Sequence, residues 1–200
     1  MTLAGPANRV PALSAWWVLI AGAVGLLASA ALMVEKVKSL ANPSYVPSCN
    51  INPVLSCGSV MVTPQASALD FPNPLLGIVG FTIVLVAGVL AVAKVPLPQW
   101  FWVWLTAGTV VGAVFVHWLI FQSLYRIGAL CPYCMVVWVV IMALLVVVTS
   151  IALRPVLPNR GAAVRTLFHW RWSIAALWFT VLFLLIMVRF WDYWSTLLPR

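Results

Sequence analysis

Four cysteines are the residues of this chain with the clearest chemistry, and two of them form the motif Cys131-Pro132-Tyr133-Cys134. The apolar run after the motif predicts a helix. Pro132 suits its first position, where a missing N–H costs nothing. Cys131 then caps the helix, where unpaired N–H groups and the helix dipole stabilise a thiolate. Cys134 lies one turn later on the same face, at a separation that a disulfide tolerates. The motif therefore predicts an exchange-competent dithiol.

The other two cysteines, Cys49 and Cys57, lie on either side of Pro53, which can turn the chain back so that the two sulfurs meet. This second pair belongs to a long loop rather than to an apolar run. One dithiol at a helix end and another on a loop above it would form a relay. Successive thiol–disulfide exchanges would then carry electrons between a partner in water and an acceptor in lipid.

Two other uses of four cysteines have to be weighed. Structural disulfides are common in oxidising compartments, but a pair within one helical turn closes almost no loop and stabilises little. A zinc site with four thiolates usually has two short-spaced pairs, and the gap between Cys49 and Cys57 is longer than that. A Cys-Pro-Tyr-Cys motif also occurs in glutaredoxins, but these are soluble and place it after a strand.

The composition excludes a soluble protein. The chain is 64% hydrophobic and 7% charged, its mean hydropathy is +1.10, and a soluble chain carries roughly 25% charged residues. Soluble enzymes, disordered chains and fibrous repeats are therefore excluded. The net charge of +8 does not indicate nucleic-acid binding, because the bases lie between apolar runs and form no basic face.

Five apolar runs are long enough to cross a bilayer, which takes about 20 residues per helix. They cover residues 12–34, 75–93, 100–121, 132–153 and 172–188, and Trp and Tyr gather at their ends. A signal peptide is the alternative for the first run, because Ala28-Ser29-Ala30 resembles a cleavage site, but the run is longer than a signal core. The sequence predicts an all-α integral membrane protein.

The positions of the arginines predict how this protein is oriented in the membrane. Four of them, Arg154, Arg160, Arg165 and Arg171, fall in one short connection, which favours the cytoplasm for that connection and for the N-terminus. All four cysteines then lie on the outer face, where disulfides persist in bacteria. The proline-rich outer loop, residues 35–73, is long enough to cap the bundle.

Four motifs carry a resemblance to a known family. They are residues 50–53 (NINP), 56–61 (SCGSVM), 71–77 (FPNPLLG) and 127–134 (IGALCPYC). Together they resemble a bacterial member of the vitamin K epoxide reductase family over the first four spans and the loop. The resemblance implies a catalytic bundle of four helices around a quinone in residues 1–155, roofed by the loop. Residues 156–200 would add a basic cytoplasmic connection and a fifth transmembrane helix.

The same resemblance assigns roles to residues. Cys134 would face the quinone with Cys131 as its partner. Cys49 and Cys57 would be the shuttle pair, which reaches Cys131 by exchange with Cys57. Asn73 matches an amide that hydrogen-bonds a quinone carbonyl, although it could simply interrupt the chain between two prolines.

Two further positions are assigned in this way. Thr63 matches a loop hydroxyl that helps to hold the cap, although it could satisfy local backbone. Trp138 stands where animal members have a tyrosine, and we expect it to contact the quinone. The roles of His117, which could bridge helices or act in a site, and of Arg126, which could favour a thiolate or meet headgroups, stay open.

The predicted function is that of a membrane thiol:quinone oxidoreductase of the bacterial inner membrane. It would re-oxidise an extracytoplasmic thioredoxin-fold (DsbA-like) protein and pass the electrons to menaquinone, ubiquinone or a similar vitamin K-like quinone. The partner would be a separate protein, because no thioredoxin-like domain follows the fifth helix in this sequence. The rivals are a non-catalytic membrane assembly protein with two structural disulfides, a cysteine-based metal carrier, and reduction of vitamin K epoxide itself.

Overall fold

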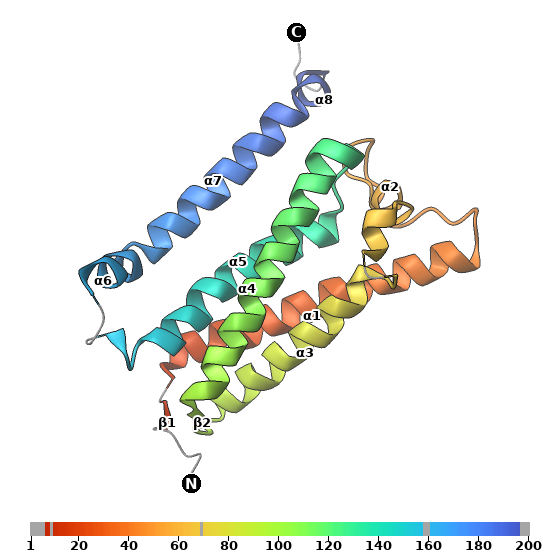
Figure 1. The fold of residues 1–200 in the computed structure, drawn as a ribbon. Coiled ribbons are helices and arrows are strands. Elements are labelled where there is room, and N and C mark those ends of the chain that lie inside the picture. Colours follow the sequence, from red (N-terminus) through yellow and green to blue (C-terminus); the bar gives the residue numbers. More distant parts are fainter. Residues whose placement is uncertain (1–6, 9, 69, 158–160, 197–200) are drawn as a thin grey trace.

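The computed structural model describes residues 7–8, 10–68, 70–157 and 161–196, and these form an almost entirely helical molecule (Figure 1). Five helices are long and apolar enough to cross a membrane: α1 (Ala12–Ala41), α3 (Asn73–Val92), α4 (Gln99–Phe121), α5 (Pro132–Leu153) and α7 (Arg171–Arg189). The expected all-α membrane fold with five spans is confirmed. Within the described residues, β1 (Ala7–Asn8) and α8 (Trp191–Thr196) lie at opposite ends of the molecule, as five crossings require.

The first span differs from its expected boundary. Helix α1 continues beyond Val34 to Ala41, so residues 35–41 are helical and the loop begins at Asn42. The reason is local, because the first helix-breaking signal after Val34 is Asn42-Pro43, and the residue before a proline disfavours the helical region. The extension carries Glu35 and Lys36 up to the level of the loop.

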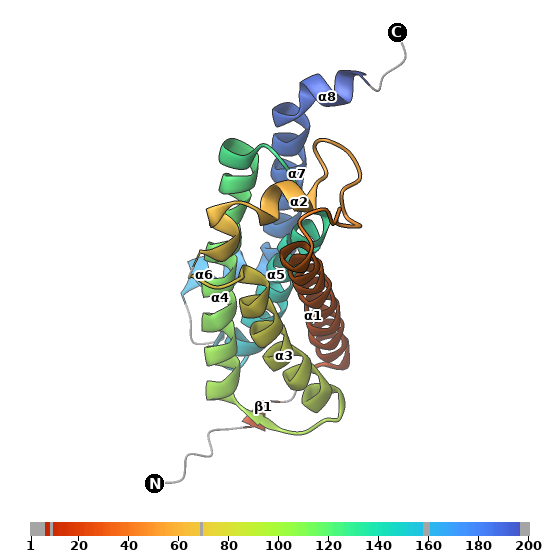
Figure 2. The ribbon, with the colours of Figure 1, turned by 90° about the vertical axis from the view of Figure 1, so that its right-hand side faces the viewer.

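The loop contains short elements that the sequence pattern does not reveal. Helix α2 (Cys57–Met61) and a 3₁₀ turn, η1 (Pro64–Ser67), lie between Asn42 and α3. This loop with its short helices covers the end of the bundle at which α5 begins (Figure 2). It is therefore a folded cap rather than an open connection.

Helices α1 and α3 approach closely because glycines face the partner helix. A Cβ atom on Gly22 would lie 2.6 Å from the backbone N of Leu85, and one on Gly88 would lie 2.5 Å from the Cα of Leu19. Small residues at such contacts let membrane helices gain van der Waals contact without a hydrophobic driving force. The α1–α3 pair therefore forms one tightly packed side of the bundle.

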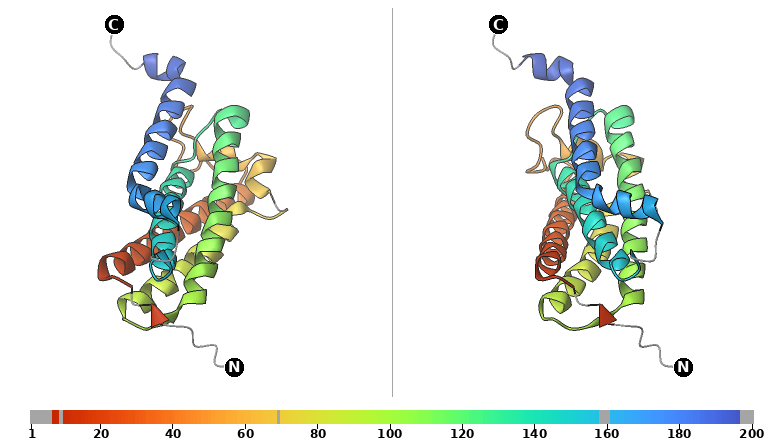
Figure 3. Two further views of the ribbon diagram at one scale, coloured as in Figure 1. Left: turned by 60° about the vertical axis from the view of Figure 1, so that its left-hand side comes forward. Right: turned by 90° about the vertical axis from the view of Figure 1, so that its left-hand side faces the viewer.

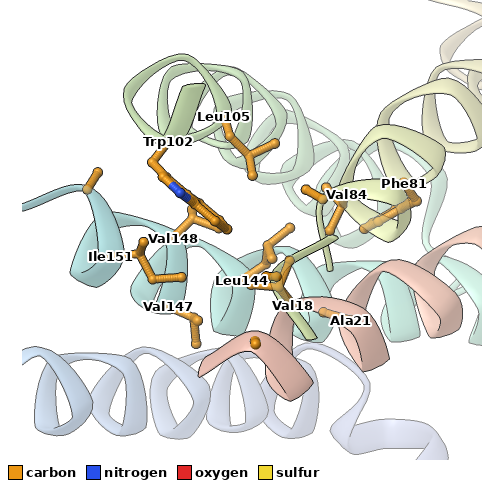
Figure 4. Packing of buried hydrophobic residues seen from close by; sticks show 14 of the residues in the cluster. Val18, Ala21, Phe81, Val84, Trp102, Leu105, Leu144, Val147, Val148 and Ile151 are labelled. Carbon is orange, nitrogen blue, oxygen red and sulfur yellow. The ribbon is translucent and has the colours of Figure 1, made fainter. Parts of the chain in front are cut away.

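The main core lies where α1, α3, α4 and α5 meet (Figure 4). Trp102 of α4 packs beside Val148 and Ile151 of α5, and Val18 of α1 lies near Leu144. The cap and the start of α5 meet in a separate cluster that contains Cys49, Cys57, Met61 and Cys131.

The fifth span, α7, packs against α5 at the outside of the four-helix group, and α6 (Ala162–His169) crosses its start (Figure 3). The indole Nε1–H of Trp178 on α7 donates to Nε2 of His117 on α4 at 2.8 Å. His117 Nδ1 lies 2.7 Å from the Ala113 carbonyl, so His117 bridges two helices as a neutral ring with its proton on Nδ1. Arg189 Nε donates to the Leu124 carbonyl at 2.8 Å.

A short antiparallel pairing joins β1 to β2 (Leu97–Pro98) at the opposite end from the cap. Helix α4 continues at its far end into a π-helical turn, η2 (Gln122–Ile127). Gly128 then adopts φ 71°, the left-handed region that glycine tolerates. This reversal leads the chain directly into the Cys131 motif.

Candidate redox site and its cavity

Cys131 and Cys134 occupy the first turn of α5, as the motif predicts. Cys131 is the N-cap with extended backbone angles, and Pro132 is the first helical residue. The Cys131 side chain is buried, and both thiols are free. A hydrogen bond from the Cys134 thiol holds the pKa of Cys131 below its usual value, burial opposes this, and the backbone N–H groups of Cys134 and Tyr133 lower it again. The first sulfur of the motif is therefore disposed to be a thiolate.

The other two cysteines, Cys49 and Cys57, are joined in a disulfide with their Cα atoms 5.6 Å apart. The chain between them reverses at an Asx turn, in which the Asn52 side-chain oxygen accepts from the backbone N–H of Val54 at 3.0 Å and of Leu55 at 2.7 Å. Pro53 lies inside this turn. The structure thus has one disulfide and one dithiol.

The two pairs lie in contact. Cys57 Sγ is 3.1 Å from Cys131 Sγ, although the residues are 74 positions apart in sequence. Backbone hydrogen bonds hold the loop there, from Ser56 N to the Leu130 carbonyl at 2.9 Å and from Leu130 N to the Val54 carbonyl at 2.7 Å. Cys57 and Cys131 are therefore positioned for thiol–disulfide exchange between the two pairs.

Polar side chains shape the turn that presents Cys57. The Asn50 oxygen accepts from Gly58 N at 2.8 Å and from Ser56 Oγ at 3.2 Å. Ser56 Oγ in turn accepts from Ser59 N at the start of α2. A Cβ on Gly58 would lie 2.9 Å from the Asn50 amide nitrogen, so this contact favours glycine there.

Two neighbouring residues in the last turns of α1, Glu35 and Lys36, anchor the loop on either side of its disulfide. Glu35 is buried and accepts from Tyr45 Oη at 3.0 Å, from Ser48 Oγ at 2.8 Å and from Ser48 N at 3.2 Å. Lys36 Nζ donates to the Met61 carbonyl at 2.5 Å, at the end of α2. Glu35 thus fixes the segment before Cys49, and Lys36 fixes the segment after Cys57.

A cavity of about 710 Å³ extends from Cys131 and Cys134 into the bundle, lined by α1, α3, α4, α5 and the cap. Its volume lies in the range of small-molecule sites, roughly 300–1,000 Å³. Apolar side chains dominate the lining, as the membrane-buried part of a quinone would require. Polar lining residues are Ser29, Lys36, Gln65, Asn73, Thr109, Gln122 and Ser123.

The predicted quinone contacts, Asn73 and Trp138, and the predicted cap residue, Thr63, lie in different surroundings. Asn73 lines the cavity at the start of α3, but its amide also joins the cap, donating to the Gln65 carbonyl at 2.7 Å and accepting from Ala68 N at 3.0 Å. Trp138 lines the cavity, is 1% exposed, and its Nε1–H has no hydrogen-bond partner among the described residues. Thr63 Oγ1 donates to the Val60 carbonyl at 2.7 Å, which is a local bond within the cap.

Among the described residues, Trp102, Trp138 and Trp194 each have a buried Nε1–H without a partner, and of these three Trp138 is the one that lines the cavity. A quinone carbonyl bound there would supply the acceptor that buried donors normally have, and the apolar cavity fits its ring. The residues present therefore fit a quinone.

Sequence reasoning missed Glu35 and Lys36 as site residues. An ionisable residue inside a membrane-spanning helix is costly and usually functional. That signal applies to Glu35 and Lys36 only when α1 continues past Val34, as it does in the structure. Arg126 is exposed, and His117 bridges α4 and α7 rather than lining the cavity.

Comparison with known proteins agrees with this geometry. A search of curated proteins found no significant match. The sequence model of the Vitamin K epoxide reductase family matches residues 16–149, which is more than half of the chain and includes all four cysteines. Proteins of this family are membrane oxidoreductases linked to quinones and thioredoxin-like partners. This chain, a multi-pass membrane protein with a disulfide beside a free dithiol, belongs to the vitamin K epoxide reductase family.

Proposed function

We propose that this protein is a thiol:quinone oxidoreductase that re-oxidises an extracytoplasmic thioredoxin-fold protein and passes its electrons to a bilayer quinone, menaquinone or ubiquinone. The observation that carries the proposal is the 3.1 Å contact between Cys57 Sγ and Cys131 Sγ, with a quinone-sized cavity beyond it. Residues 1–155 are the catalytic unit, and residues 156–200 add a basic connection and the fifth helix. The net result is disulfide formation outside the cytoplasm.

The first step is reduction of the shuttle disulfide. A thiolate of the partner attacks the Cys49–Cys57 bond, forms a mixed disulfide with Cys49 and releases Cys57 as a thiolate. The second thiol of the partner then resolves the mixed disulfide, so the partner leaves oxidised and the loop holds two thiols. Because Cys49 and Cys57 are 5% and 0% exposed, the cap has to open for this step.

The second step is transfer within the protein. The Cys57 thiolate attacks Cys131 in the oxidised helix pair and releases Cys134, and Cys49 then attacks Cys57 and releases Cys131. The product has a Cys49–Cys57 disulfide and a Cys131/Cys134 dithiol, which is the arrangement of the structure. The N-cap position and the Cys134 thiol stabilise Cys131 as leaving group.

The third step occurs at the cavity. A quinone, when bound, would supply the acceptor for two electrons and two protons. Cys134 and Cys131 would give up the electrons and become a disulfide, and Trp138 Nε1–H and the second N–H of the Asn73 amide would donate to the carbonyl oxygens. Donors that are already in place stabilise charge as it develops on oxygen, because they need no reorganisation. The apolar lining excludes water from the reacting atoms.

The membrane orientation belongs to the same proposal. The arginine-rich connection faces the cytoplasm of a bacterial inner membrane, and the cap with all four cysteines faces outward. This places the shuttle pair in the compartment where disulfides persist.

The test is turnover of the purified protein with a soluble quinone analogue and dithiothreitol. We expect quinol formation, and we expect it to be abolished in Cys131→Ala and in Cys134→Ala. Cys49→Ala and Cys57→Ala should lose turnover with a protein donor but keep part of it with the small thiol, which can react directly with the Cys131–Cys134 disulfide when the cap opens. Turnover in the two helix variants would contradict the proposal, and equal total loss in all four would make the loop pair structural.

A further inference from the structure

Lys36 is unusual among the residues around the cavity. Of the described residues that line it, Lys36 is the one with a formal charge at neutral pH. Its Nζ donates to the carbonyl of Met61, and Met61 is buried in one cluster with Cys49, Cys57 and Cys131. Leu32, one turn earlier on α1, packs against the same cluster. The charge of Lys36 is therefore held at the sulfur end of an apolar cavity.

An ammonium group has three N–H donors, and the Met61 carbonyl uses one of them. The other two remain for a ligand. A cation in a low-dielectric site interacts strongly with negative charge that develops nearby. Lys36 thus has the position, the charge and the donors to act on an oxygen atom bound at this end.

The proton balance of the proposed reaction leaves a role for such a group. The helix pair holds Cys131 at the N-cap, which stabilises a thiolate, and Cys134 as a thiol. Oxidation of this pair to a disulfide releases two electrons and one proton. Reduction of a quinone to a quinol consumes two electrons and two protons, so one proton has to come from elsewhere.

We propose that Lys36 is a catalytic residue that binds the quinone oxygen nearest the sulfurs and supplies the second proton. This inference rests on the proposed function. The Cys131 thiolate and the Cys134 thiol become a disulfide, Cys134 gives up one proton, and the Lys36 ammonium gives up the other and becomes an amine. Water at the outer face then returns a proton to Lys36, and the cycle is balanced.

The alternative is that Lys36 only tethers α2. Lys36→Gln separates the two roles, because its amide can still donate to Met61 but carries no charge. Lys36→Arg keeps the charge. Lys38→Gln is the matched control: Lys38 lies half a turn further along α1, is exposed, and stands 5.7 Å above the Tyr45 ring.

The experiment compares the binding of two soluble naphthoquinones by quenching of tryptophan fluorescence. One is neutral, and the other carries a ring hydroxyl that is ionised at neutral pH and therefore imitates an oxygen with developing charge. We expect Lys36→Gln to lose about tenfold in affinity for the anionic probe and little for the neutral one. Lys36→Arg and Lys38→Gln should bind both probes like the wild type, but Lys36→Arg should also slow quinol formation, because a guanidinium does not give up its proton. Quinol formation should slow in Lys36→Gln, while exchange between Cys57 and Cys131, followed by alkylation without quinone, should not.

An unchanged ratio of the two affinities in Lys36→Gln would overturn the role of Lys36, and the proposed function would stand as long as both probes bind the wild type. Slower exchange between the cysteine pairs in Lys36→Gln, with an unchanged affinity ratio, would mean that Lys36 is only a tether. Failure of both probes to bind the wild type would overturn the proposed function itself.

Discussion

The unpaired indole of Trp138 allows a test in which activity and stability respond differently. Trp138 and Trp102 are both buried, at 1% and 0% exposure, and in both the Nε1–H has no partner in the part of the chain that the structure describes. Trp138 lines the cavity, whereas Trp102 is absent from the described residues that line it and packs in the main core. Substitution of each by Phe keeps an aromatic ring and removes the donor.

The expected effect on stability is small and similar in the two variants. An unsatisfied buried donor costs about 1–3 kcal/mol, which its removal recovers. The smaller ring leaves a small cavity that costs about 1 kcal/mol. The free energy of unfolding should therefore stay within about 2 kcal/mol of the wild-type value for both Trp138→Phe and Trp102→Phe.

The expected effect on quinone reduction differs between them. Loss of one well-organised donor to an oxygen that gains charge costs about 3 kcal/mol of barrier, or roughly a hundredfold in rate. Trp138 is held rigidly by burial, so we expect Trp138→Phe to slow quinol formation by about tenfold to a hundredfold. Trp102→Phe should retain the wild-type rate, because its donor does not reach the cavity.

The assay is steady-state reduction of a soluble quinone analogue with dithiothreitol, together with thermal unfolding in the same detergent. Exchange between Cys57 and Cys131, measured without quinone, should be unchanged in both variants. Equal rates for Trp138→Phe and Trp102→Phe would refute the reasoning, because both variants lose the same chemical group and only its location differs.

Three further predictions concern the cysteines and the cap. The double variant Cys49→Ala/Cys134→Ala should accumulate a Cys57–Cys131 disulfide, seen by peptide mass spectrometry, whereas Cys57→Ala/Cys134→Ala should form little Cys49–Cys131 disulfide; the reverse yield would contradict the observed sulfur contact. With the loop disulfide intact, the first thiolate to form on titration, followed by thiolate absorbance, should be Cys131, with a pKa below that of an ordinary thiol. The thiolate is present above that lowered pKa and is lost as the pH falls through it. Cys134→Ala should raise this pKa because it removes the largest cause, and an unchanged pKa would assign the shift elsewhere. Asn73→Ala should slow quinone reduction about tenfold and also increase proteolysis of the cap, because its amide bonds Gln65 and Ala68; unchanged proteolysis and kinetics would reduce Asn73 to a chain-breaker.

The opening of the cap connects these experiments. The loop disulfide is buried beside Cys131, so a folded partner cannot reach it while Glu35 and Lys36 hold both sides of the loop. Glu35 bonds Tyr45 and Ser48 in the segment before Cys49, so we expect these bonds to break when the cap opens.

The sequence by itself determined the features that depend on local residues. The five spans follow from the length and hydropathy of each run, and a bilayer imposes both requirements on every spanning helix. Cys131 becomes an N-cap because Pro132 starts the helix, which is a property of neighbouring residues. The close pairing of Cys131 with Cys134 follows from the 3.6-residue period of the same helix.

Only the tertiary structure decided how the sulfurs of Cys57 and Cys131 are brought together. From the sequence we expect Cys57 to exchange with Cys131, and the two sulfurs are in contact because the backbone of Val54 and Ser56 bonds Leu130. The anchoring by Glu35 and Lys36 and the second use of Asn73 in the cap are also contacts between distant segments. Such contacts depend on how a long loop folds over packed helices, and neither the period of a helix nor the spacing of cysteines specifies that arrangement.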